Sequence, residues 1–142
     1  MDTIKKFEEM QVWKDSRKLT QSIYSLTRMR AFQTDFMLVK QMRTCVIETM
    51  NNIAEGFEKR SKRDFIQSLH ISKCSLSELR SQIYIAYDQK YIDVDTFKEI
   101  LIEVTQVSQQ ISGLIKYLNT YSKAELTAQL QTVTSRSGYL FY

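Results

Sequence analysis

The chain contains no proline and only three glycines in 142 residues. These two residue types normally form hairpins and tight turns, so their scarcity argues against a sheet-rich fold and favours long helices with short connections. The sequence also lacks any apolar run of the roughly 18 to 20 residues that a membrane span requires. Its first residues, MDTIKKFEEM, lack the apolar core of a signal peptide. We therefore expect one cytoplasmic domain with no membrane partner.

Residues that commonly ligate metals or carry catalysis are also scarce. His70 is the only histidine, and no carboxylate stands three residues before it, whereas di-metal bundles use Glu-x-x-His pairs from two helices. Cys45 and Cys74 lie in helical patterns without metal-binding spacing, so we interpret both as small buried hydrophobic residues in a reducing compartment. Glycine-rich phosphate loops and nucleophile–base pairs are missing as well. We predict no metal, no cofactor and no catalytic residue, and hence a protein that is not an enzyme.

What the sequence has in abundance is helical periodicity. Apolar residues recur at alternating intervals of four and three, which keeps one stripe of a helix facing a partner. The pattern predicts helices over about residues 7–29, 35–57 and 61–90, and a fourth helix whose apolar seam covers residues 97–118. Four such helices are enough to enclose one core.

Polar residues stand where three of these helices should begin. Asp35 and Ser61 are placed to cap the second and third helices, and Asp93 or Asp95 can cap the fourth. The connections are about five residues long, which favours antiparallel neighbours. The predicted fold class is therefore all-α, an antiparallel up-down-up-down four-helix bundle.

The composition changes near the end of the fourth helix. We assign residues 1–121 to the bundle. Residues 122–142 are rich in Ser, Thr and Gln and finish in Tyr139-Leu140-Phe141-Tyr142, so we expect a polar C-terminal tail with an apolar end.

The second predicted helix carries two apolar rows instead of one. Leu38, Met42 and Cys45 run beside a seam that contains Val39 and Val46. An extra row facing solvent would form an apolar patch that soluble monomers seldom tolerate, so it favours a closed homo-oligomer. The alternative is that both rows face the bundle core, because a wide apolar stripe is normal for a central helix.

Several segments resemble one protein family. The opening Phe7-Glu8-Glu9-Met10-Gln11-Val12-Trp13 resembles the F-x-x-L-x-V-W start of four-helix-bundle proteins encoded in intervening sequences of bacterial 23S ribosomal RNA. Asn52-Ile53-Ala54-Glu55-Gly56-Phe57 is the strongest match, and Ser75-Leu76-Ser77-Glu78-Leu79 with Gln82 resembles the family's G-S-x-x-E-L-x-x-Q segment. The resemblance spans about residues 7–92. The accessory variability proteins of diversity-generating retroelements share the fold.

The resemblance implies a non-enzymatic, nucleic-acid-associated accessory protein that binds RNA or DNA as a homo-oligomer, with a ring of five favoured. A reverse transcriptase or another protein is a further candidate partner. The family's Q-x-R-R appears here as Gln41-Met42-Arg43-Thr44, which keeps one arginine, and Glu48-Thr49-Met50 replaces its S-I-P, so the second helix should lack a proline kink. The alternative function is a structural homo-oligomeric module without a nucleic-acid partner.

Positive charge is concentrated in the first half of the chain. Residues 1–63 hold 13 basic and 8 acidic side chains, whereas residues 64–142 hold 7 and 8. The candidate nucleic-acid-binding residues are Lys59, Arg60, Lys62, Arg63 and Arg43. The first four lie within five residues at a helix start and are suited to phosphate contacts of little sequence specificity. The alternatives are a solvated loop for these four and, for Arg43 with Glu55 and Glu78, ion pairs that fix helix register.

Overall fold

The computed structural model describes residues 4–120, so the predicted tail at 122–142 lies outside the described residues. The elements are the 3-10 turns η1 (Phe7–Glu9) and η2 (Arg30–Phe32) and the helices α1 (Gln11–Thr27), α2 (Phe36–Glu58), α3 (Lys62–Asp88) and α4 (Val94–Thr120). No strand occurs in this part of the chain, which confirms the all-α prediction. None of the helices between residues 4 and 120 is long and apolar enough to cross a bilayer.

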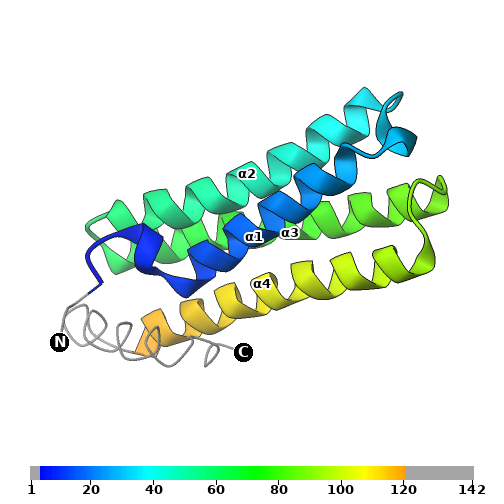
Figure 1. Cartoon of the computed structure of the whole chain (residues 1–142). Helices are drawn as coiled ribbons and strands as arrows, with labels where there is room; N and C mark the ends of the chain where they lie inside the picture. The colour runs from blue at the N-terminus through cyan, green and yellow to red at the C-terminus, as the bar shows by residue number, and fades with distance from the viewer. Residues whose placement is uncertain (1–3, 121–142) are drawn as a thin grey trace.

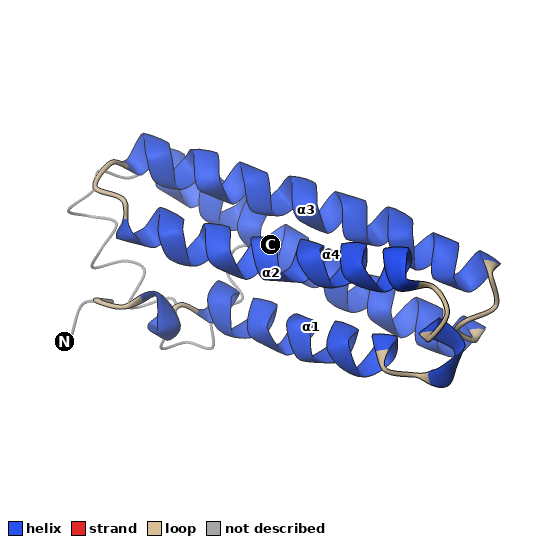
Figure 2. Cartoon of the chain, turned by 90° about the horizontal axis from the view of Figure 1, so that it is seen from above, coloured by secondary structure: helices blue, strands red, loops and turns tan. Residues whose placement is uncertain are grey.

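The four helices form an antiparallel bundle (Figure 1). Each helix contacts the next one along the chain, and α1 also contacts α4, which closes the bundle. The α1–α2 and α3–α4 connections lie at one end and the α2–α3 connection at the other (Figure 1 and Figure 2), so the helices alternate up and down as predicted. The contact between α2 and α3 is the most extensive, and that between α1 and α4 is the least.

The core is formed by the predicted apolar seams. One residue from each helix illustrates this, because Leu19, Ile53, Leu76 and Ile111 have no exposed surface. A buried serine on the α3 seam finds a partner across the helix interface, where Ser72 Oγ donates to the carbonyl oxygen of Thr49 at 3.0 Å. Pairing of this kind removes the cost of burying a hydroxyl group.

The predicted caps stand at three helix starts. Asp35 Oδ1 accepts a hydrogen bond from the Leu38 amide at 3.1 Å, and Ser61 Oγ accepts one from the Asp64 amide at 3.1 Å. At the fourth helix Asp93, not Asp95, is the cap, because its Oδ1 accepts from the Thr96 amide at 2.8 Å. Each bond satisfies one of the amides that a helix start leaves without an intrahelical partner.

The end of α3 has a conformation that usually calls for glycine. Lys90 follows the helix with φ 64°, in the left-handed region. Its amide bonds the carbonyl of Tyr87, and the amide of Tyr91 bonds that of Ala86, both at 2.9 Å. These two bonds are the Schellman pattern that terminates many helices. The predicted end of this helix near Lys90 is therefore confirmed.

The first predicted helix, residues 7–29, is wrong as a single element. Met10 is extended, with φ −76° and ψ 130°, and separates the turn η1 from α1. Its side chain is only 3% exposed, so the break allows this residue to reach the core. Phe7 then lies edge-on against Trp13, with ring centroids 5.2 Å apart. We infer that the packing of these side chains stabilises the fold more than one additional turn of helix would.

The second apolar row of α2 lies in the core. Leu38, Met42 and Cys45 are 6%, 0% and 2% exposed. The idea that this row is left in solvent is therefore wrong. The alternative that both rows face the core holds only in part, because Val46 of the other row is buried whereas Val39 is half-buried and Phe36 is 80% exposed. α2 also runs without interruption from Phe36 to Glu58, as expected from the absence of proline.

Only one cysteine fits the prediction of a buried hydrophobic residue. Cys45 is buried between α2 and α3, whereas Cys74 is exposed. Cys74 lies between the buried seam residues Ser72 and Leu76, so the helical repeat turns it outward. Both residues are free thiols.

Candidate nucleic-acid interface

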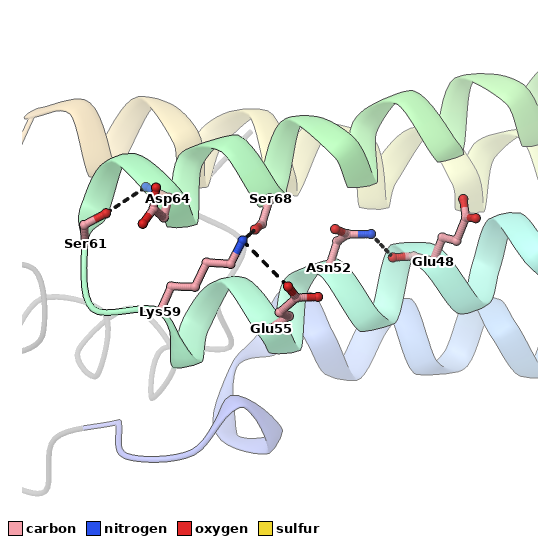
Figure 3. Close-up of polar contacts among 7 residues, drawn as sticks. All are labelled: Glu48, Asn52, Glu55, Lys59, Ser61, Asp64 and Ser68. Atoms are coloured by element: carbon pink, nitrogen blue, oxygen red, sulfur yellow. Dashed lines mark hydrogen bonds and ion pairs between the residues drawn. The ribbon is translucent and has the colours of Figure 1, made fainter.

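The turn between α2 and α3 holds four of the five predicted cations. Gly56 lets the helices meet there, since a Cβ atom at this position would lie 2.8 Å from the Ser68 Cβ. Lys59 spans the same junction: its Nζ donates to Ser68 Oγ at 3.0 Å and lies 3.8 Å from Glu55 Oε1 (Figure 3). This lysine therefore links α2 to α3, and a neighbouring carboxylate balances part of its charge.

The other turn cations are also interleaved with acidic residues. Arg60 and Arg63 are exposed and Lys62 is half-buried. Between residues 55 and 64, however, four basic side chains stand beside three acidic ones, Glu55, Glu58 and Asp64. The turn consequently offers phosphate a net attraction of about one charge, and exposed pairs of this kind are weakened further by salt.

Arg43, the fifth predicted cation, lies far from the turn. Lys59 follows it by sixteen positions, directly after the end of α2, which corresponds to about 24 Å along the helix axis. Its Nε donates to Thr27 Oγ1 at 2.9 Å, and its Cζ lies 4.5 Å from the centre of the Tyr24 ring. Both partners belong to α1, so Arg43 joins α1 to α2 and has a fixed position. The predicted site is thus divided between two ends of the bundle.

The predicted register-fixing ion pairs are wrong. Glu55 has a side chain that is 67% exposed, and it pairs with Lys59 from its own helix. Glu78 accepts a long hydrogen bond from Cys45 Sγ at 3.7 Å. Burial raises the pKa of this thiol to about 11, so it stays protonated and able to donate. The hydrogen bonds of Arg43 and Lys59 to neighbouring helices are therefore made to the neutral hydroxyl groups of Thr27 and Ser68, not to carboxylates.

Arg43 borders a groove that the sequence did not reveal. The groove, which we call the basic groove, has a volume of about 560 Å³ and lies where α1, η2 and α2 meet. It is lined by Thr27, Arg28, Phe32, Gln33, Phe36, Val39, Lys40, Arg43, Thr44 and Ile47. Three of these residues are cationic and none is acidic, so the groove attracts anions without an opposing carboxylate in its wall.

The one acidic residue in this part of the sequence is engaged elsewhere. Residues 27–47 contain four basic side chains and a single carboxylate, Asp35. Asp35 caps α2 through Oδ1, and its Oδ2 accepts a hydrogen bond from Tyr91 at 2.9 Å. The latter bond raises the pKa of the Tyr91 hydroxyl. The missed cations, Arg28 and Lys40, were detectable as this local excess of charge around the first interhelical turn.

The opposite side of α1 is acidic. A second groove of about 320 Å³ between α1 and α4, the acidic groove, contains Glu99 and Glu103 and no basic residue. Ser22 donates to Glu103 at 3.0 Å, and burial raises the pKa of this carboxyl group above its ordinary value. Helix α1 therefore separates a surface that attracts phosphate from one that repels it.

The described residues contain no cluster of three potential metal-ligating side chains. His70, the only histidine, is exposed on α3.

Comparison with known proteins places this fold in a family. Residues 8–113 match the family model for the 23S rRNA-intervening sequence protein. A crystal structure of a protein of unknown function from the S23 ribosomal protein family of Bacteroides thetaiotaomicron VPI-5482 superimposes with a TM-score of 0.69. The two are 23% identical, and the match covers 74% of this chain and 98% of that one, which shows a shared fold. No curated protein is similar enough to count as a match. The chain belongs to the 23S rRNA-intervening sequence protein family.

Proposed function

We propose that this protein is a non-enzymatic accessory protein that binds the phosphate backbone of RNA or DNA. The observation that carries the proposal is the basic groove, where Lys40 and Arg43 line one concave surface without a carboxylate. Arg28 lines it as well, although its Nη2 also donates to Ser25 Oγ at 3.2 Å, a residue of the acidic groove. Cations of this kind gain affinity by releasing the counterions that surround a nucleic acid. Arg43 is already held against Tyr24 and Thr27, so little side-chain entropy is lost when it meets a phosphate.

The test compares the basic groove with the α2–α3 turn. Affinity for a labelled RNA is measured by fluorescence anisotropy at several salt concentrations for the wild type, Arg28→Gln/Lys40→Gln and Arg60→Gln/Arg63→Gln. Loss of two phosphate contacts should flatten the slope of log affinity against log salt by about 1.4 to 1.8 units. We expect this change in the groove variant and a smaller one in the turn variant, because the turn carries three carboxylates of its own.

Two results would count against the assignment. Absence of binding at low salt would reject a nucleic-acid partner. A larger effect of the turn substitutions would move the site back to Lys59, Arg60, Lys62 and Arg63, the cluster that stands out in the sequence.

We further propose that the protein acts as a homo-oligomer, for which a ring of five is the arrangement that the family resemblance implies. Exposed apolar side chains at the α3–α4 connection support self-association: Tyr84, Ile85, Tyr87 and Val94 are 37–49% exposed. Apolar surface gathered in one region commonly marks a protein contact. Light scattering coupled to size exclusion tests this. A 16.8 kDa particle at micromolar concentration would reject the oligomer, and a dimer would reject the ring.

The same apolar region favours a second candidate function, a structural module that associates only with itself or with another protein. The two functions differ in one measurement. An oligomer that shows no affinity for RNA or DNA at low salt would support the structural module and exclude the nucleic-acid role.

A further inference from the structure

We infer that the basic groove binds single-stranded nucleic acid, with a base stacked on Phe36 and the adjacent phosphates on Lys40 and Arg43. This inference rests on the proposed function and specifies its ligand. It starts from an exposed aromatic ring: Phe36 is 80% exposed, more than any other large apolar residue in the described part of the chain, and it lies in the wall of the groove.

Phe36 sits on a rigid part of the backbone. It is the first residue of α2, directly after the cap Asp35. That cap holds the amide of Leu38 through its side chain and the amide of Val39 through its carbonyl, each at 3.1 Å. A ring on a fixed backbone offers a stacking surface at little entropic cost.

Phe36 and the groove cations lie on one side of α2. Lys40 and Arg43 follow Phe36 at intervals of four and three residues, the spacing that places side chains in a row along a helix. The row extends about 10 Å from Phe36 to Arg43. Proteins commonly bind single strands through an aromatic ring beside a row of cations. The ring stacks on a base, and the cations contact the phosphates of the backbone.

The surroundings of the groove disfavour a duplex. Bases in a double helix are already stacked on each other, so they present only their edges to a protein. Gln33 is the one amide side chain in the groove wall, and its Nε2 donates to the carbonyl of Arg28 at 3.0 Å, which occupies it within the turn. A duplex that extended across α1 would also bring phosphates toward Glu99 and Glu103, which line the acidic groove between α1 and α4.

The experiment uses the whole protein and two probes: a labelled twelve-nucleotide single strand, and the same strand annealed to its complement. Phe36→Ala should weaken single-strand binding roughly fivefold or more and change duplex binding less than about twofold. Met37→Ala is the matched control, since Met37 is 73% exposed on the next residue but does not line the groove. Phe36→Trp should retain the affinity, because it restores an aromatic face.

The outcomes separate this inference from the proposed function. If Arg28→Gln/Lys40→Gln weakens both probes and Phe36→Ala weakens neither, the single-strand inference is overturned while phosphate binding stands. Equal losses with Phe36→Ala and Met37→Ala would also overturn it. If neither probe binds at low salt, the proposed function itself fails. Far-ultraviolet circular dichroism confirms that each variant is folded, and exposed positions such as Phe36 tolerate substitution.

Discussion

Replacement of Gly56 by alanine should destabilise the bundle, even though alanine is the better helix former. Gly56 is buried where α2 meets α3. A Cβ atom there would lie 2.8 Å from the Ser68 Cβ and 3.0 Å from the Phe65 Cδ1. The Ser68 Cβ is attached directly to the backbone of α3 and cannot rotate away, so the two helices would have to separate.

The expected loss follows from two opposing effects. Alanine in place of glycine inside a helix contributes up to about 1 kcal/mol of stability, and less near the helix end where residue 56 lies. Forcing an extra methyl group into a close-packed contact costs about 1–3 kcal/mol. The second effect is larger because the α2–α3 contact is the most extensive in the bundle. We expect a net loss of about 1–2 kcal/mol, or roughly 3 to 8 °C in Tm.

Urea unfolding followed by circular dichroism measures this loss, with an unchanged m-value as evidence that the unfolding reaction is the same. Ser68 provides the control. Ser68→Gly removes the Cβ that the new methyl group meets, so Gly56→Ala should cost much less in that background. Ser68→Ala keeps the Cβ and should give no such relief. A neutral or stabilising Gly56→Ala in the wild type, or equal costs in both backgrounds, would refute the steric explanation.

Most of the fold could be predicted because, in a helical bundle, the spacing of apolar residues along each helix indicates which side faces the core. The intervals of four and three placed Leu19, Ile53, Leu76 and Ile111 in the core, and all of them are fully buried. The caps at Asp35 and Ser61 were equally local. The break at Met10 was not predictable in this way, because it depends on where the chain before α1 meets the core.

The two apolar rows of α2 show where the same reasoning stops. Leu38 and Met42 could face a neighbouring copy or the core of their own bundle, and spacing alone does not distinguish these. The structure decides for the core, since α2 is buried against α1 and α3 on two sides. Apolar side chains that remain exposed include Phe36 and Met37 at the start of α2 and Tyr84 and Ile85 near the end of α3.

The candidate site was harder to predict than the fold. A run of cations in the sequence points to Arg60 and Arg63, yet their turn also holds three carboxylates. Arg28 and Lys40 are twelve residues apart and became neighbours only because the α1–α2 turn folds back. The sequence suggested ion pairs for Arg43, whereas its partners, Thr27 and Tyr24 on α1, were identified only in the three-dimensional structure. A run of cations in the sequence therefore does not reveal which cations share a concave surface of the folded protein.

Four further substitutions or reactions test the structural reasoning. Ser61→Ala should cost about 1 kcal/mol of unfolding free energy through loss of the α3 cap, and an unchanged urea midpoint would contradict this. Lys90→Gly should stabilise the protein by about 0.5–1 kcal/mol, because Lys90 has φ 64°. At pH 8 a thiol reagent should modify exposed Cys74 and spare Cys45, whose pKa is raised to about 11; rapid labelling of both would refute its burial. Finally, Glu103→Gln should raise stability at pH 7. Burial raises the pKa of Glu103, so the folded protein holds the proton of this carboxyl group more tightly than the unfolded chain does. Stability therefore falls as pH rises from the pKa of the unfolded chain through the higher pKa of the folded protein, because the carboxyl group must then be ionised in a partly buried place. Glutamine stays neutral and can still accept the bond from Ser22. The gain should be below about 1 kcal/mol, since half of the group faces solvent, and it should disappear at acidic pH, where the glutamate is protonated in both states. A gain that persisted unchanged at low pH would show that the substitution acts through packing instead of charge.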